Sequence, residues 1–284
     1  MSVVYKSMIA LVLLFFGGTV SMAEDAPRPG NEITGAGAHF SWIVFNELKA
    51  DLENKFGRTL KLYGRGSMLG AGCNAGIKTA KKNKPGAESF GFVCCPLGAD
   101  EVNNEGLVVH DFAIEPIVIL VHRDNPVTNL SSSQVRAIFR GDITNWAEVG
   151  GADKPIVVVT RLHCKQRPGH WKTILPAPAL FRKDRLNVRS AAEMVKRVGD
   201  FTEAIGHTGA TWNFDDHGGV KVITVDGNAP NAANLKAKSY PFYRTLSAVT
   251  HGTISKELKG MLKEVQKGPG FRKLADRYGL LPTH

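Results

Sequence analysis

Short apolar runs alternate with amphipathic segments along most of the chain. Apolar and β-branched runs predict strands, and apolar residues spaced by three or four positions predict helices. The predicted strands are 32–35, 60–63, 89–94, 107–112, 116–122, 155–160, 204–208 and 220–225. The predicted helices are 40–56, 68–80, 131–139, 191–198, 255–265 and 271–278. Strands that alternate with helices are typical of an α/β fold with mostly parallel sheets and helices on both faces.

Residues 1–23 have the pattern of a secretory signal peptide. Lys6 precedes the apolar run 8–20, and Ser21 and Ala23 are small residues at the positions that a signal peptidase reads. The run is shorter than the ~20 residues of a spanning helix, which makes an uncleaved membrane anchor the weaker alternative. We therefore expect cleavage after Ala23 and a mature protein in the periplasm.

The composition is that of a globular protein with a basic surface. The chain has 284 residues, of which 43% are hydrophobic and 22% charged, with a formal net charge of +10. This length suggests two domains. The densest basic run, 78–84, precedes Pro85 and Gly86 as at a helix end, where the helix dipole stabilises cations. The charge therefore indicates attraction of anions or of an acidic partner surface rather than nucleic-acid binding.

Three strand-to-helix junctions carry candidate chemistry. Residues 35–40 and 64–67 are rich in glycine, which lets the backbone approach a ligand closely, and residues 160–164 follow a strand. Because a helix N-terminus presents free N–H groups, these junctions could form an anion nest, with Ser67 donating a hydroxyl and Arg161 a guanidinium. Ordinary turns between elements are the alternative.

Several motifs resemble those of one protein family. Residues 138–146 read IFRGDITNW, preceded by NPVTNLS at 125–131 and followed by PIVVV at 155–159. This series closely resembles the periplasmic phosphate-binding proteins of ABC-type uptake systems, and the likeness extends over nearly the whole mature chain. Further matching segments are ITGAGA at 33–38, AIGHT at 204–208, SYPF at 239–242 and YGLLP at 278–282.

The resemblance implies a type II periplasmic-binding-protein fold, in which two α/β domains are joined by a two-segment hinge. Domain I would combine residues 31–112 with 245–284, and domain II would be residues 117–240. A small anionic solute would be held in the cleft between them. The partner would be a membrane ABC permease or the ectodomain of a sensor kinase. We expect a monomer with no nucleic-acid partner and no cofactor.

The resemblance also places the ligand site, where this chain departs from the family. The family's first loop reads Ala-Thr-Phe, and this chain has His39 at the middle position. Positions with Ser or Asp in the family's second site strand are Val93 and Cys94 here. The Gly-Ser-Gly-Thr that follows the family's arginine is missing after Arg161. The predicted ligand-binding residues are Ala38, His39, Phe40, Ser67, Cys94, Arg161, His163 and Cys164.

Two kinds of solute fit this altered site. Ser67, Arg161 and the helix N-termini suit a phosphate-like oxyanion. The replacements supply imidazole and thiol groups, which are ligands of soft or borderline metals and of trivalent arsenic. The alternative is a protein that binds or senses a thiophilic ligand such as arsenite, copper or zinc. Its ligands would be His39, Cys94, His163 and Cys164.

The four cysteines raise the question of disulfides. Cys94 and Cys95 are adjacent in a predicted strand, so their side chains should point to opposite faces and not bond to each other. Cys73 could pair with Cys95 within the first domain. A bond between Cys94 and Cys164 would pin the two domains together, so we expect these two residues to be free thiols, ligands or a redox latch.

The sequence contains no evident catalytic constellation. The chain lacks the Gly-x-Ser-x-Gly, His-Glu-x-x-His and phosphate-loop motifs. The cluster Asp215, Asp216 and His217 lies in a polar loop and is interpreted as a surface turn. Most other histidines, including His170, are assigned to the surface or to hydrogen-bonded core positions, and His207 is an alternative cleft residue. We therefore predict that the protein is not an enzyme.

Overall fold

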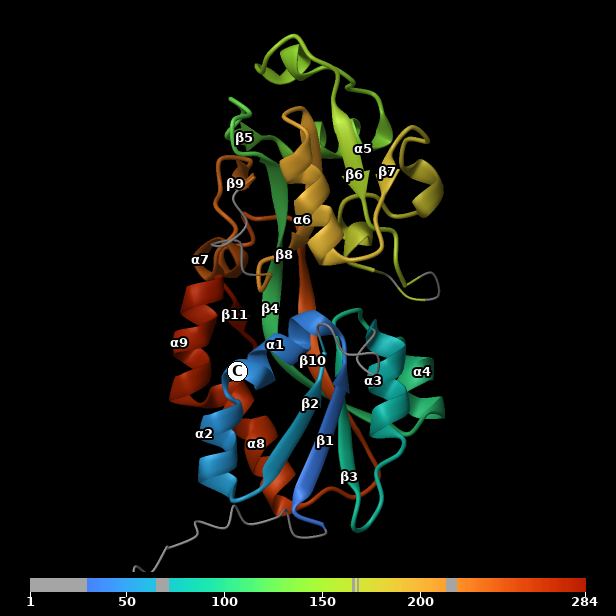
Figure 1. Cartoon of the computed structure of the whole chain (residues 1–284), viewed down its shortest axis with the longest axis vertical. Coiled ribbons are helices and arrows are strands. Elements are labelled where there is room, and N and C mark those ends of the chain that lie inside the picture. Colours follow the sequence, from blue (N-terminus) through green and yellow to red (C-terminus); the bar gives the residue numbers. More distant parts are fainter. Residues whose placement is uncertain (1–29, 65–71, 165–166, 168, 213–218) are drawn as a thin grey trace, which may run out of the picture.

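The computed structural model describes residues 30–64, 72–164, 167, 169–212 and 219–284 (Figure 1). Helices lie on either side of a long mixed sheet, in the α/β arrangement that the sequence predicts. The signal peptide, Ser67 and the cluster 215–217 lie outside the described residues. None of the helices in the described ranges is long and apolar enough to cross a membrane.

The first lobe is built on three parallel strands, which are followed in the sheet by two antiparallel ones, in the order β2-β1-β3-β10-β4. These strands are β1 (Glu32–Gly37), β2 (Thr59–Tyr63), β3 (Glu88–Val93), β4 (Leu107–His122) and β10 (Tyr243–His251). The helices are α1 (His39–Glu47), α2 (Lys49–Phe56), α3 (Gly72–Ala80), α4 (Ala99–Asn104), α8 (Lys256–Lys267) and α9 (Pro269–Tyr278). In Figure 1, α3 and α4 lie on one side of the strands, and α2, α8 and α9 lie on the other.

The second lobe continues the sheet from β4 in the order β4-β8-β6-β7, with β9 pairing with both β4 and β5. Its strands are β5 (Asn129–Leu130), β6 (Val157–Thr160), β7 (Leu186–Asn187), β8 (Ala204–Gly209) and β9 (Val220–Val225). Its helices are α5 (Ser132–Arg140), α6 (Ala191–Asp200) and α7 (Ala232–Lys236), with 3₁₀ turns at Trp146–Val149, His170–Thr173 and Pro178–Leu180. The last strand, β11 (Leu281–Pro282), pairs with β4.

Strand β4 belongs to both lobes. Its residues 107–116 pair with β10, and its residues 117–122 pair with β8 and β9. The sequence pattern predicted two strands here, and the structure has one, in which the intervening Glu115 pairs with Arg244 of β10. Figure 1 shows β4 and β10 running side by side between the lobes, which gives the two-segment connection. The domain boundaries inferred from the sequence stay predictions.

Other elements differ from the sequence pattern in detail. The predicted helix 40–56 is two helices, since Leu48 is the C-cap of α1 and the N-cap of α2. Strand β10 and helices α4 and α7 were not predicted. Helix α5 begins after Ser131, as expected, and Ser131 and Gln134 form a capping box.

Aromatic side chains fill the core of each lobe. In the first lobe, the rings of Phe45, Phe90 and Phe92 lie with centroids 5.1 to 5.3 Å apart. In the second lobe, Trp146 is buried, and its Nε1 donates to the carbonyl oxygen of Glu203 at 2.8 Å. The assignment of Trp146 to packing is therefore confirmed.

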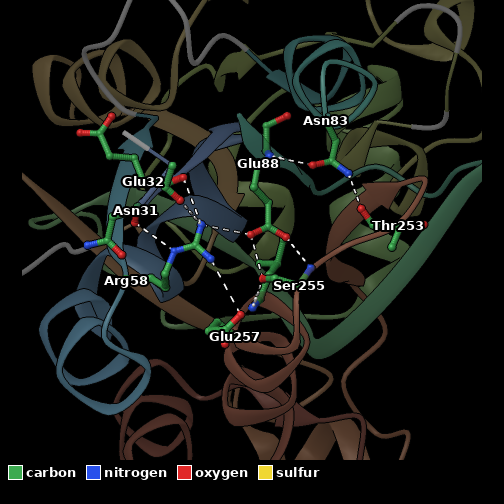
Figure 2. A network of polar contacts seen from close by, with 11 residues as sticks. Asn31, Glu32, Arg58, Asn83, Glu88, Thr253, Ser255 and Glu257 are labelled. Carbon is green, nitrogen blue, oxygen red and sulfur yellow. Dashed lines mark hydrogen bonds and ion pairs between the residues drawn. The ribbon is translucent and has the colours of Figure 1, made fainter. Parts of the chain in front are cut away.

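A polar network closes the end of the first-lobe sheet where β1 begins (Figure 2). Arg58 donates to the carbonyl oxygens of Asn31 at 3.0 Å and Gly30 at 3.1 Å, and lies 3.4 Å from the carboxylate of Glu88. Glu88 accepts from the backbone N–H and the hydroxyl of Ser255, at 2.6 and 2.8 Å. Because Ser255 also caps α8, the Arg58 network (Arg58, Glu88 and Ser255) ties the strand ends to that helix.

Candidate functional site

Helix α1 begins where the first ligand loop was predicted. Ala38 is its N-cap, with a backbone N–H that donates to the carbonyl oxygen of Phe92 at 2.9 Å, and no side chain caps the helix. The first turn contains no acidic residue, so nothing there offsets the partial positive charge of the helix end. This N-terminus is therefore suited to an anion.

A buried ion pair joins the two connecting strands beside this helix. Arg244 donates to Glu115 through Nε at 2.6 Å, and its Nη2 lies 2.5 Å from the same carboxylate without forming a hydrogen bond to it. The guanidinium lies 4.0 Å from the ring centroid of Phe40. Glu115 also accepts from the backbone N–H and the hydroxyl of Thr211, at 2.9 and 2.6 Å. Burial opposes the charge on Arg244, but the Glu115 carboxylate outweighs it and raises the pKa of Arg244. The pair is thus neutral overall and holds Arg244 in place.

Arg161 is a second cation in this region, and it has no such partner. It follows β6 and donates through Nε to the carbonyl oxygen of Arg189 at 3.2 Å. Within the described ranges, no carboxylate pairs with Arg161. Burial lowers its pKa and the charge of Arg244 adds to this effect, whereas the nearby sulfurs of Cys94, Cys164 and Cys95 act in the opposite direction. An arginine nevertheless keeps its proton at neutral pH, so the site carries a positive charge that no described carboxylate pairs with.

Three histidines, which we call the histidine row, extend from Arg244 into the second lobe. The ring centroids of His163 and His170 are 4.6 Å apart, and those of His170 and His207 are 4.9 Å apart. Nη1 of Arg244 lies 3.2 Å from Nδ1 of His170, which must accept because a guanidinium only donates. Nε2 of His170 and both ring nitrogens of His207 are buried without a hydrogen-bond partner among the described residues.

The histidine row is electrically neutral near neutral pH. Burial is the main cause, and it lowers the pKa of His163 to about 4 and that of His207 to about 3. Burial also lowers the pKa of His170, and the positive charges of Arg244 and Arg161 act in the same direction. Neutral imidazoles can donate from one nitrogen and accept or ligate with the other.

Three cysteine sulfurs gather next to His163. The Sγ atoms of Cys73, Cys95 and Cys164 all lie within 4.8 Å of one another, and those of Cys95 and Cys164 are 3.1 Å apart. Nε2 of His163 lies 3.9 Å from the sulfur of Cys95. All of these cysteines are free. Hydrogen bonds from Cys73 and Cys95 lower the pKa of Cys164 to about 4. We call Cys73, Cys95, Cys164 and His163 the thiol cluster.

The predicted site residues are only partly brought together. Arg161, His163 and Cys164 lie on the loop after β6, at the histidine row and the thiol cluster. The ring of His39 instead lies 5.0 Å from that of Trp212. In the described part of the chain, neither His39 nor Cys94 belongs to the group of sulfurs that could share a metal ion. His207, the alternative cleft residue, is buried in the row.

Cys94 and Cys164 are free, as the sequence analysis expected, but their sulfurs do not belong to one group. Strand β3 ends at Val93, so the alternation of a strand does not fix the directions of the next two side chains. The backbone N–H of Cys94 donates to the sulfur of Cys73 at 3.3 Å, and the Cys94 sulfur is buried 3.9 Å from that of Cys73. The sulfur that meets Cys164 is that of Cys95. The expected Cys73–Cys95 pair lies in the same cluster without a bond.

Sequence reasoning missed several residues of this region, namely Cys73, Cys95, Glu115, His170 and Arg244. A signal existed for Glu115, because a carboxylate inside an apolar strand needs a buried partner. Nothing in one sequence identifies that partner as Arg244, which is 129 positions away. His170 was predicted to be a surface or core residue, because the sequence does not reveal its contacts with the rings of His163 and His207.

Comparisons with known proteins agree with this architecture. Residues 22–165, about half of the chain, match the model of the PBP superfamily domain. The phosphate-binding protein PstS of Bacillus subtilis (strain 168) is 29% identical over 172 residues, covering 57% of this chain and 52% of that protein. The PstS protein of Borreliella burgdorferi is 24% identical over 148 residues, covering 49% and 53%. The chain therefore spans about half the length of the curated relatives it matches.

Solved structures match over most of the chain. A phosphate ABC transporter substrate-binding protein with bound phosphate, from Clostridium perfringens, has a TM-score of 0.72 at 23% identity and covers 89% of this chain and 100% of that one. An ABC-type phosphate transport receptor from Vibrio cholerae has a TM-score of 0.64 at 25% identity, covering 88% and 99%. These matches confirm the fold class and the resemblance that the sequence motifs indicated.

Proposed function

Because this chain belongs to the PBP superfamily, we propose that it is an exported solute-binding protein. It holds a small phosphate-like oxyanion between its lobes and delivers it to a membrane ABC permease. The relatives described above are phosphate-binding proteins, and binding and release of a solute need no catalytic step. Two lobes connected by β4 and β10 can open and close around a solute, which shifts the population toward the closed form.

The observation that carries this proposal is the unpaired charge of Arg161. The nearby Arg244 is neutralised by Glu115, whereas the described residues offer Arg161 only the carbonyl oxygen of Arg189. A partly buried cation without a counterion is costly, and an oxyanion would supply the missing charge through charge-assisted hydrogen bonds. The uncapped start of α1 and Ser67 would add donors to the same solute.

The histidine row supports an oxyanion rather than a cation as solute. His170 accepts from Arg244 at Nδ1, so its proton is on Nε2, where it has no acceptor among the described residues. A buried N–H without an acceptor costs free energy. A solute oxygen near this nitrogen would remove that cost, and His207 could donate in the same way. The row would then replace some of the hydroxyl donors that the sequence lacks relative to the family.

Calorimetric titration of the mature protein with phosphate, arsenate and sulfate tests the proposal. At least one of these anions should bind, and Arg161→Ala should weaken its binding by about 10–100-fold, the effect of losing a hydrogen bond between charged groups. Arg140→Ala is the matched control, because Arg140 is an exposed arginine of the same lobe that pairs with Asp142 at 2.8 Å. Failure of all three anions to bind would refute the oxyanion, and unchanged binding by Arg161→Ala would refute its placement.

The partner and the location need separate experiments. We propose release into the periplasm after cleavage at Ala23, which cell fractionation and N-terminal sequencing of the mature protein would test. Capture by a membrane permease supports uptake. Capture by a sensor-kinase ectodomain instead would make the protein a sensor of the same solute.

A further inference from the structure

The thiol cluster is not explained by anion binding. Thiolates are negatively charged, so a deprotonated cluster repels an oxyanion rather than binding it. Cys73 and Cys95 are each only 2% exposed, and they meet Cys164 and His163 from another segment of the chain. Soft thiolates with one imidazole are the ligand set that thiophilic metal ions prefer.

The distances in the cluster suit a single tetrahedral ion. With metal–sulfur bonds of ~2.3 Å and a metal–nitrogen bond of ~2.0 Å, a tetrahedral centre places its sulfurs ~3.8 Å apart and nitrogen ~3.6 Å from sulfur. The sulfurs of Cys95 and Cys164 are 3.1 Å apart, and all three sulfurs lie within 4.8 Å of one another. Nε2 of His163 is 3.9 Å from the sulfur of Cys95. His163 lies outside the group of ligand atoms that are all within 4.8 Å of one another, so its ring would have to move toward Cys73 and Cys164 to complete the set.

The surroundings orient two of the ligands. Nδ1 of His163 lies 3.2 Å from the carbonyl oxygen of Arg161, which can only accept, so this nitrogen carries the proton and Nε2 keeps its lone pair for an ion. Metal-binding histidines usually donate their other N–H to such an acceptor. The backbone N–H of Cys94 donates to the sulfur of Cys73 at 3.3 Å, which stabilises the thiolate.

The backbone of Cys164 also has an unusual conformation. Its φ of 55° is in the left-handed region, which residues other than glycine seldom adopt and which concentrates at functional sites. The indole N–H of Trp171 donates to the carbonyl oxygen of His163 at 2.6 Å and holds the preceding residue. The loop therefore presents the Cys164 sulfur to Cys95 in spite of an unfavourable backbone conformation.

We propose that Cys73, Cys95, Cys164 and His163 bind one thiophilic metal ion such as Zn²⁺ in a tetrahedral site of three sulfurs and one nitrogen. Cys73 comes from α3 and Cys95 follows β3, both in the first lobe, whereas His163 and Cys164 follow β6 in the second. The ion would therefore bridge the two lobes while they are closed. This inference goes beyond the proposed function and holds whichever anion the protein carries.

The segments that would hold the ion are already in contact. Nε of Arg167, three residues after Cys164, lies 2.8 Å from each carboxylate oxygen of Glu101 in α4. Arg167 also donates to the side chain of Asn74, the neighbour of Cys73. A metal site here would need no large rearrangement of the two lobes.

Titration with Co²⁺, a spectroscopic substitute for Zn²⁺, tests the proposal on the mature protein kept reduced with a phosphine. One equivalent should produce sulfur-to-cobalt charge-transfer absorption and the visible bands of a tetrahedral ion, and Zn²⁺ should displace it. Cys73→Ser, Cys95→Ser, Cys164→Ser and His163→Gln should each weaken binding by more than the ~10–100-fold typical of outer-sphere partners. Cys94→Ser is the matched control and should bind Co²⁺ as the parent does. Circular dichroism of each variant establishes that it is folded.

Several results would overturn the metal site. The first is loss of Co²⁺ binding in Cys94→Ser but not in Cys95→Ser. Binding of arsenite or Cu⁺ to the three thiols without any dependence on His163 would overturn the nitrogen ligand. A Cys95–Cys164 disulfide in protein isolated without reductant, together with no metal bound after reduction, would overturn the site altogether. Arg161→Ala should lose the anion and retain Co²⁺, so the two proposals fail independently.

Discussion

Two polar groups of residues, the Arg58 network and the candidate site, lie in different parts of the molecule and are built differently. In the Arg58 network, Arg58 and Glu88 contact each other, and Glu88 accepts from both donors of Ser255 (Figure 2). In the candidate site, Arg161 has no carboxylate partner in the described ranges. Buried ring nitrogens of the histidine row likewise have no hydrogen-bond partner among the described residues. Polar groups with a structural role form hydrogen bonds and ion pairs with one another, whereas a binding site has polar groups without a protein partner, which are available to the ligand.

The largest effect should come from breaking the buried ion pair of Glu115 and Arg244 within the candidate site. Glu115→Ala leaves the charge of Arg244 buried without a carboxylate, so we expect a loss of about 3–5 kcal/mol in the free energy of unfolding. Urea denaturation measures it. The double variant Glu115→Ala, Arg244→Met removes both charges and should recover part of the loss. A loss below about 1 kcal/mol in the single variant would show that the pair is not desolvated.

The next effect depends on pH and distinguishes the unsatisfied histidines from the Arg58 network. Because the pKa of His207 is about 3 in the fold against an ordinary 6.5, the unfolded chain takes up the proton first as the pH falls. The neighbouring charges of His163, Arg161 and Arg244 strengthen this effect. Stability is therefore unaffected by this group above pH 6.5 and falls as the pH drops toward 3.

At about pH 5 this single histidine should cost about 2 kcal/mol of stability relative to neutral pH. His207→Leu should lose that contribution, so its unfolding free energy should fall less steeply with acid than that of the parent. Chemical denaturation at a series of pH values measures both. Parallel pH profiles for the two proteins would mean that His207 is protonated in the fold.

A smaller effect separates stability from binding. Glu88→Gln removes the charge that Arg58 and Ser255 contact but keeps one acceptor, so we expect a loss of about 1 kcal/mol in unfolding free energy. Anion binding should not change. Arg161→Ala should show the opposite pattern, with weaker binding and no loss of stability. If both variants altered both stability and anion binding, the difference between the Arg58 network and the candidate site would not hold.

The smallest effect concerns the contact between the lobes. Arg167 pairs with Glu101 at a partly exposed position, so Arg167→Ala should change the unfolding free energy by less than about 1 kcal/mol. The same variant removes a contact made only when the lobes meet and should weaken solute binding by a few fold. Calorimetry compares it with Lys196→Ala, which removes an exposed pair within one helix of the second lobe. Equal binding by the two variants would contradict a role for Arg167 in closure.

Sequence patterns predicted the helices and strands that are determined by residues close together in the chain. Helix α5 begins after Ser131 as expected, and the alternation of strands and helices indicated the fold class. Strand β10 was missed, although both its neighbours in the sheet, β3 and β4, were recognised at least in part. Its residues include Arg244, a charged group whose burial depends on Glu115 of a strand far away in the chain.

The candidate site was predicted less completely than the helices and strands, because its residues come from distant segments of the chain. Arg161, His163 and Cys164 were identified from their resemblance to a family loop. Cys94 was chosen because it stands at a position that carries a ligand residue in the family, and the structure brings the sulfur of the next residue, Cys95, to Cys164. Cys73 and His170 were given structural interpretations, since their partners come from other segments.

By itself, the sequence determined the class of fold, the family and the position of the cationic loop, because these depend on periodicity and on short motifs of contiguous residues. The tertiary structure alone decided which sulfurs meet, which arginine is neutralised and which histidines are buried. Those properties depend on atoms brought within a few ångströms by segments that are distant in the chain. The chemistry of the candidate site therefore depends on contacts between residues that are far apart in the sequence.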